Sequence, residues 1–278
     1  MNHEIWQQWQ QSEVCLLNEP AECPARDSSV WVRQAWLLFK RRKWTWMMMV
    51  GGYWLIIMLC MWGLAGFLAG KIPQYAEILG WIALPLAVVC IVLLTGGMMI
   101  SAASLAEDDD LKFVYLFSGF QYHLKPLLLL SFMLMAWVVL MVGGMLWLAG
   151  MLPPKSAWFW VLIVFFILFV MLTMGMCVFS IVLVVLHDIK PFQACVMSVR
   201  AFFLNLAVFV RLVTVWKALL IVVGCVLGMV GWLLAVWLEE LAILLVFLAV
   251  PVVLTIAALA VLQMYTAYRN VWTNLPME

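Results

Sequence analysis

Six long stretches of this chain contain no charged residue. They cover residues 44–70, 78–106, 126–151, 157–186, 218–238 and 241–268. Each reaches the length of about 20 residues that a helix needs to cross the hydrocarbon core of a bilayer. None has the alternation of apolar and polar residues that marks a membrane β-strand. The stretches therefore predict six transmembrane helices, because only helices and closed barrels satisfy the backbone polar groups within lipid.

The composition agrees with a membrane protein. The chain has 278 residues, of which 68% are hydrophobic and 10% are charged. Soluble domains are about half apolar and about one quarter charged. The net charge of +1 gives no overall field that would attract nucleic acid. The expected fold class is an all-α, polytopic transmembrane helix bundle of about six spans, with the lipid bilayer as its first partner.

Lysine and arginine residues are distributed unequally between the predicted loops. With the N-terminus inside the cell, the outer loops hold only Lys71 and Lys155 of the fifteen Lys and Arg residues. This asymmetry predicts that both termini are cytoplasmic. The basic run 40–43 precedes the first span and is expected to contact lipid headgroups. Residues 1–27 carry five acidic residues and lack a signal-peptide core, so the first span is expected to remain as an uncleaved anchor.

Three amphipathic segments on the cytoplasmic side resemble helices that lie along the membrane surface. They cover residues 29–43, 110–125 and 190–205. Asp27, Ser28 or Ser29 is expected to cap the first of them, because these side chains can accept a hydrogen bond from a free helical N–H group. Pro191 suits the first turn of the third.

The same features recur with a period of about 80 residues. Pairs of glycines seven positions apart occur in the first, third and fifth spans, and a phenylalanine recurs near the end of each amphipathic segment. These residues are Gly63 and Gly70, Gly143 and Gly150, Gly224 and Gly231, and then Phe39, Phe120 and Phe202. We predict three repeats of one interfacial helix and one transmembrane hairpin, at residues 29–109, 110–188 and 189–272. A cytoplasmic tail (1–28) precedes them and a short one (273–278) follows.

Each glycine pair lies on one stripe of its helix, because seven residues make nearly two turns. Gly66 with Gly70, and Gly224 with Gly228, also form the GxxxG spacing that allows two membrane helices to approach closely. All of these glycines are predicted to pack against other helices. A membrane-protein partner or a second copy of the chain could use the same stripe.

Lys217 lies seven residues before Gly224, on the same stripe. If the stripe faces the bundle, Lys217 is expected to bind a lipid phosphate or an anionic substrate. The alternative is that its side chain extends to the cytoplasmic headgroups. Arg211, earlier in the same segment, is expected to lie at the interface.

The acidic cluster at the end of the second span has two interpretations. Glu107, Asp108, Asp109 and Asp110 could hold a divalent cation through their oxygen atoms. They could equally form a solvated loop that precedes the next helix. The sequence contains no recognisable catalytic motif and no cofactor motif. We therefore expect no catalytic residue, no resident metal and no cofactor.

Three short motifs stand out in the sequence: residues 116–128 with the pattern LFSGF followed by HLKPLL, the segment QAWLLF at 34–39, and the ending YTAYR at 265–269. They resemble motifs of an uncharacterised family of bacterial inner-membrane proteins with about six spans. The resemblance covers residues 30–272 and implies a bacterial cytoplasmic membrane location. In that family an Asn-Pro pair follows the first amphipathic segment, whereas this chain has basic residues there. The resemblance implies no activity and no site residues.

These observations leave three functions open. The first is a non-enzymatic scaffold or accessory subunit in the membrane, which the glycine stripes and short outer loops favour. The second is a transporter or channel for a small or lipidic solute, in which Lys217 would bind the solute. The third is a lipid-modifying enzyme at the cytoplasmic face that uses Asp108, Asp109 and His187.

Overall fold

The computed structural model describes residues 14–64, 66, 76–151, 158–237 and 242–275. Within these residues the chain is helical apart from short connections and one isolated bridge between Leu16 and Thr273. Six helices are long and apolar enough to cross a membrane. The predicted all-α, multi-pass membrane architecture is therefore confirmed. The predicted outer loops, with Lys71, Lys155, Glu239 and Glu240, lie outside the described residues.

The long helices agree closely with the charge-free stretches. Their bounds are α3 at Lys43–Met58 with a π-helical continuation η1 at Leu59–Leu64, α5 at Ala76–Glu107, α7 at Leu124–Met151, α8 at Trp158–His187, α10 at Leu206–Trp237 and α11 at Ala242–Trp272. The largest difference is at α10, which begins twelve residues before the predicted span. Arg211 and Lys217 lie inside this helix, because Lys and Arg are good helix formers even where they are costly in lipid.

The three amphipathic segments also form helices. They are α2 at Asp27–Arg41, the 3-10 helix η3 at Phe113–Phe117 followed by α6 at Ser118–Tyr122, and α9 at Pro191–Leu204. The expected N-cap of the first was wrong. Arg26 occupies the cap position and makes no side-chain cap hydrogen bond. The N–H groups of Asp27, Ser28 and Ser29 instead donate to carbonyls three residues earlier, which satisfies donors that a capping side chain would otherwise serve.

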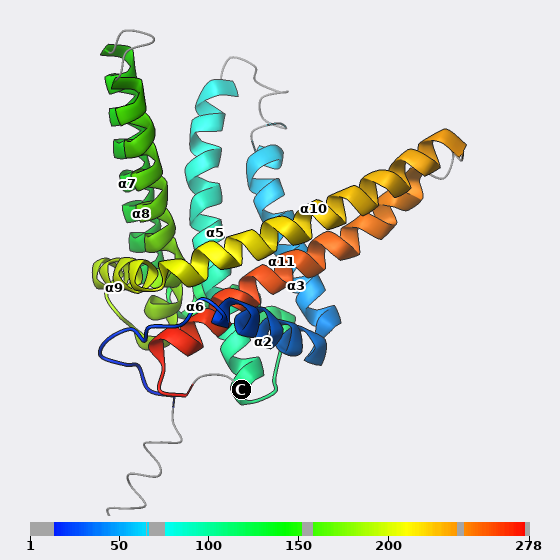
Figure 1. The fold of residues 1–278 in the computed structure, drawn as a ribbon, viewed down its shortest axis with the longest axis horizontal. Helices are drawn as coiled ribbons and strands as arrows, with labels where there is room; N and C mark the ends of the chain where they lie inside the picture. Colours follow the sequence, from blue (N-terminus) through cyan, green and yellow to red (C-terminus); the bar gives the residue numbers. More distant parts are fainter. Residues whose placement is uncertain (1–13, 65, 67–75, 152–157, 238–241, 276–278) are drawn as a thin grey trace, which may run out of the picture. The chain divides into compact units, whose positions relative to one another are not determined.

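The chain divides into two compact units that interleave along the sequence. Unit 1 contains residues 1–51, 105–113 and 204–278, and unit 2 contains residues 52–104 and 114–203. In unit 1, α10 and α11 run side by side, and α2 packs against both of them (Figure 1). In unit 2, α7 and α8 form a hairpin, and α6 packs against α7 (Figure 1).

Two glycines in unit 2 allow the backbones of two helical segments to approach closely. A Cβ at Gly97 of α5 would overlap the carbonyl oxygen of Leu116, and a Cβ at Gly119 of α6 would overlap the carbonyl oxygen of Leu93. The short interfacial helix α6 therefore lies backbone to backbone against α5. Only glycine permits this approach, because every other residue carries a Cβ.

Each interfacial helix is joined to the span that follows it by a single residue. Arg42 lies between the end of α2 at Arg41 and the start of α3 at Lys43. In the same way, His123 lies between α6 and α7, and Asn205 lies between α9 and α10. Arg42, His123 and Asn205 are thus 81 and 82 positions apart. We call these three residues the junction residues.

Candidate functional site

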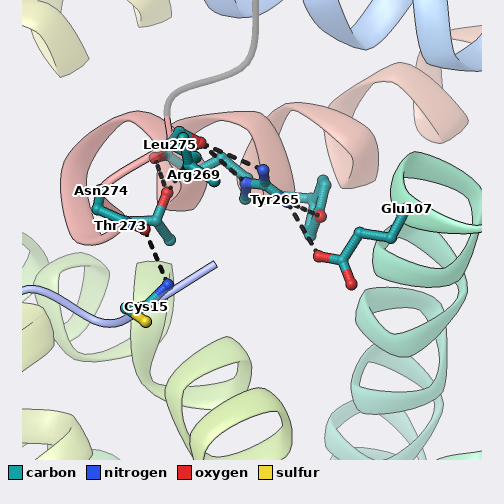
Figure 2. A network of polar contacts seen from close by, with 7 residues as sticks. All are labelled: Cys15, Glu107, Tyr265, Arg269, Thr273, Asn274 and Leu275. Carbon is teal, nitrogen blue, oxygen red and sulfur yellow. Dashed lines mark hydrogen bonds and ion pairs between the residues drawn. The ribbon is translucent and has the colours of Figure 1, made fainter. Parts of the chain in front are cut away.

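The densest polar network of the described residues surrounds Arg269, in the last turn of α11 (Figure 2). The side chain of Arg269 is only 10% exposed. Its Nη1 atom donates to Glu107 Oε1 at 3.1 Å and to the Tyr265 hydroxyl at 3.1 Å. Its Nε and Nη2 atoms donate to the Leu275 carbonyl oxygen at 3.3 and 3.2 Å. Each nitrogen of the guanidinium is therefore occupied by a group of unit 1.

This arrangement suits a cation at the end of a helix. The last carbonyl groups of α11 carry partial negative charge, and Arg269 lies beside them. Its planar guanidinium directs donors toward Glu107 on one side and Leu275 on the other (Figure 2). The contact joins the end of α5, which carries Glu107, to the end of the chain. The chemistry is that of a structural clamp.

An extended N-terminal segment crosses the same end of α11. We call residues 14–24 the strap. The Leu17 and Ala21 N–H groups donate to the carbonyl oxygens of Trp272 and Val271, both at 2.8 Å. These are carbonyls at the end of a helix, where no intrahelical donor remains. The strap therefore supplies the donors that complete α11.

The side chains of Asn274 and Asn205 hold the two ends of the strap. The Cys15 N–H donates to Asn274 Oδ1 at 2.8 Å (Figure 2). The Cys23 N–H donates to Asn205 Oδ1 at 2.7 Å, and Asn205 Nδ2 donates back to the Ala21 carbonyl at 3.0 Å. One asparagine thus satisfies a donor and an acceptor of the strap.

The two thiols of the strap are expected to react at different rates with a maleimide. Cys15 is exposed. Burial, and to a lesser extent the nearby Asp27 carboxylate, raises the pKa of Cys23 to about 11. Because the thiolate is the reactive form, Cys23 should react at least tenfold more slowly than Cys15 near pH 8. Mass spectrometry of peptides from briefly labelled protein measures both rates; equal rates in the folded protein would contradict the strap as described.

The junction residues all make polar contacts within their own units. Arg42 lies 3.8 Å from the Asp109 carboxylate and also donates to the Asp109 carbonyl oxygen at 3.3 Å, both in unit 1. His123 Nδ1 lies 3.4 Å from Asp188 Oδ1, in unit 2. Asp109 and Asp188 follow the ends of α5 and α8 and both have a positive φ, of 50° and 52°. At the third junction, Asn205 contacts the strap instead of a carboxylate.

The predicted acidic cluster does not converge on one point. Glu107 pairs with Arg269, Asp109 with Arg42, and Asp110 with Lys112 at 3.0 Å. Asp108 is exposed. Within the part of the chain that the structure describes, no group of three or more His, Cys, Asp or Glu residues is placed to hold a metal ion.

Lys217 and Arg211 lie on α10, and both side chains are exposed. Their neighbour Trp216 faces the helix partner and donates through Nε1 to Gln263 Oε1 of α11. Lys217 therefore lies away from the α10–α11 contact within unit 1. The prediction that it binds a lipid phosphate or an anionic substrate stays a prediction.

The predicted glycine stripe is open within each unit. Among the described residues, nothing lies within 4 Å of a Cβ built at Gly66, Gly143, Gly150, Gly224 or Gly228. A Cβ at Gly63 would touch only Leu59 of its own helical segment, at 3.8 Å. Gly231 is half-buried, and Gly70 lies outside the described residues. Packing by the open glycines stays a prediction for contacts beyond their own unit.

Sequence reasoning missed the glycines that pack most tightly and the role of Arg269. Gly97 lies in a GG pair without any recurring spacing. Gly119 belongs to the LFSGF motif, and Arg269 ends the YTAYR motif. Both motifs carry the family resemblance, but a glycine within an amphipathic interfacial segment is also a signal of close backbone approach.

Comparison of the chain with protein-family models, with curated proteins and with solved structures found no match.

Proposed function

We propose that this chain is a scaffold or accessory subunit of the bacterial cytoplasmic membrane, with both termini in the cytoplasm. The observation that supports this proposal is that groups within unit 1 occupy the hydrogen-bond donors of Arg269. A buried arginine at a helix end is a natural anion site, but here Glu107, Tyr265 and Leu275 take up its donors. The most elaborate polar network thus closes unit 1 and presents no cation to a substrate.

The membrane location and orientation rest on the sequence. The asymmetry of Lys and Arg supports cytoplasmic termini. The resemblance to bacterial inner-membrane proteins with six spans supports the cytoplasmic membrane. Six candidate spans are consistent with an even number of crossings, which returns the C-terminus to the side of the N-terminus.

The proposal includes three repeats of an interfacial helix and a hairpin. The spacing of the junction residues, 81 and 82 positions, supports it. The first two junctions also make similar contacts. Arg42 contacts Asp109, which follows α5, and His123 contacts Asp188, which follows α8. Both aspartates have a positive φ. In the third repeat the strap replaces the aspartate. Copies in one orientation would be related by an axis along the membrane normal.

The surface of α10 supports an association role. On this helix Ile221, Val222 and Trp232 are each at least 60% exposed. Gly224 and Gly228 on the same helix are open. Small residues allow a second helix to approach closely in lipid. We propose that another helix, from a partner subunit or a second copy of the chain, packs on this stripe.

Native mass spectrometry of the full chain in mild detergent tests the scaffold function. We expect the wild type to carry a second protein chain. The Gly224→Val/Gly228→Val variant should lose about 90% of that complex, because valine side chains keep the helices apart. The control Val226→Leu/Met229→Leu changes exposed residues on other faces of α10 and should retain it. A wild-type chain that is always solitary would refute the proposal.

A transporter for a small or lipidic solute is the second candidate, and Lys217 is the observation that favours it. This exposed cation lies eleven residues into α10, roughly 16 Å along the helix. An ionisable group within a candidate membrane span, here Leu206–Trp232, is costly unless it has a use. Solute flux into liposomes that falls at least tenfold in Lys217→Ala, with the helix content unchanged, would favour transport over the scaffold function.

A further inference from the structure

The junction between α2 and α3 carries a basic surface that the other two junctions lack. Lys40, Arg41 and Lys43 are exposed around the junction residue Arg42. At the equivalent positions the second repeat has Gln121, Tyr122 and Leu124, and the third has Phe203, Leu204 and Leu206.

Three of the four basic residues of this junction make contacts of two kinds. Arg42 is held by Asp109 of the same unit, through both its carboxylate and its carbonyl oxygen. Lys40 and Lys43 instead lie over aromatic rings. The Lys40 ammonium is 5.9 Å from the centre of the Trp36 ring, and the Lys43 ammonium is 5.5 Å from that of Trp44. A ring in this position attracts the cation without neutralising its charge.

The rings themselves face outward. Trp36 is 42% exposed and Trp44 is 68% exposed, next to Leu37 at 42%. Tryptophan prefers the headgroup region of a bilayer, where one part of the ring is in lipid and the N–H is in water. The surface therefore combines side chains that enter the interface with cations held at the same level.

We propose that Trp36, Lys40, Arg41, Lys43 and Trp44 form a binding site for the headgroup of an anionic phospholipid. The phosphate would lie between the two ammonium groups and the Arg41 guanidinium, and the acyl chains would run along α3. Charge complementarity selects an anionic lipid over a zwitterionic one, because a headgroup amine would be repelled by three cations. The site does not depend on the scaffold function, since it requires only that α3 crosses the membrane.

Binding of phosphatidylglycerol and phosphatidylcholine to the detergent-solubilised full chain, measured by native mass spectrometry, tests the site. The Lys40→Gln/Lys43→Gln variant should bind phosphatidylglycerol about thirtyfold more weakly. The control Lys125→Gln/Lys190→Gln removes the same charge from exposed positions at the start of α7 and just before α9, and should change binding less than twofold. Lys40→Arg/Lys43→Arg should retain binding, and phosphatidylcholine should bind weakly to all variants.

Three outcomes would overturn the proposal. Equal losses in the two glutamine variants would mean that only net charge matters. Equal binding of the two lipids to the wild type would mean that the surface does not select a charge. Retention of inorganic pyrophosphate as strongly as phosphatidylglycerol would mean that the site binds a free anion. None of these outcomes bears on whether a second protein chain binds α10, so this test and that of the scaffold function are separate.

Discussion

Replacing Gly119 with alanine is expected to destabilise unit 2 by about 2 kcal/mol or more. The new Cβ would overlap the carbonyl oxygen of Leu93 and would also approach the Gly97 backbone. Both are main-chain atoms of α5, which cannot rotate away as the tip of a side chain can. The interfacial helix α6 must therefore move off α5. The midpoint of thermal unfolding in detergent should fall by roughly 5 °C or more.

Gly143→Ala is the matched control for this prediction. Gly143 also lies in a helix of unit 2, but nothing is within 4 Å of a Cβ at that position. Alanine is a better helix former than glycine, so this variant should be as stable as the wild type or slightly more stable. Gly97→Ala should behave like Gly119→Ala, because its Cβ meets the Leu116 carbonyl oxygen. Equal midpoints for Gly119→Ala and Gly143→Ala would contradict the backbone contact.

Replacing Arg269 with glutamine should destabilise unit 1 by about 2–3 kcal/mol. The substitution removes a buried cation that donates to Glu107, Tyr265 and Leu275. Glutamine cannot reach Glu107 and Leu275 together, since it lacks the forked donors of arginine. The strap should open more often, because its partners Trp272 and Asn274 flank the segment that Arg269 holds. The unfolding midpoint and the labelling rate of Cys23 measure the two effects.

Three further variants separate the clamp from a general effect of charge. Arg269→Lys keeps the charge but not the fork, and it should lose about half as much stability. Glu107→Gln should cost about 1 kcal/mol or less, because the Glu107 side chain is 49% exposed. Cys23 should react faster in Arg269→Gln but not in Lys217→Gln, which also removes one cation. Unchanged labelling of Cys23 in Arg269→Gln would show that the clamp does not hold the strap.

The spans could be predicted from the sequence because a charged side chain in lipid has a large free-energy cost. This cost depends on the residue itself and not on its neighbours in the fold. For that reason the ends of α7 and α8 lie within two residues of the charge-free stretches. The start of α10 could not be found in this way, since Arg211 and Lys217 end the apolar stretch without ending the helix. Charge marks the boundary of lipid, whereas backbone hydrogen bonding marks the boundary of a helix.

The Arg269 network could not be predicted, because its partners are distant in sequence. Arg269 and Glu107 are separated by 162 positions, and Cys15 and Asn274 by 259. Each of these residues has a local explanation in the sequence, as a topology signal, an acidic loop residue or a tail residue. The recurring spacing of glycines likewise predicted a stripe that is open within each unit. It could not predict the contact between Gly97 and Gly119, because these two positions share no spacing pattern in the sequence.

The strap has a consequence for how the protein is made. Residues 14–24 leave the ribosome well before the helix end that they complete, which lies about 250 positions later in the chain. Unit 1 therefore cannot close until α11 has been synthesised, and the contacts between the strap and the end of α11 are expected to form slowly because they are distant in sequence. A nascent chain that stops before α11 would leave the Leu17 and Ala21 N–H groups without their carbonyl partners.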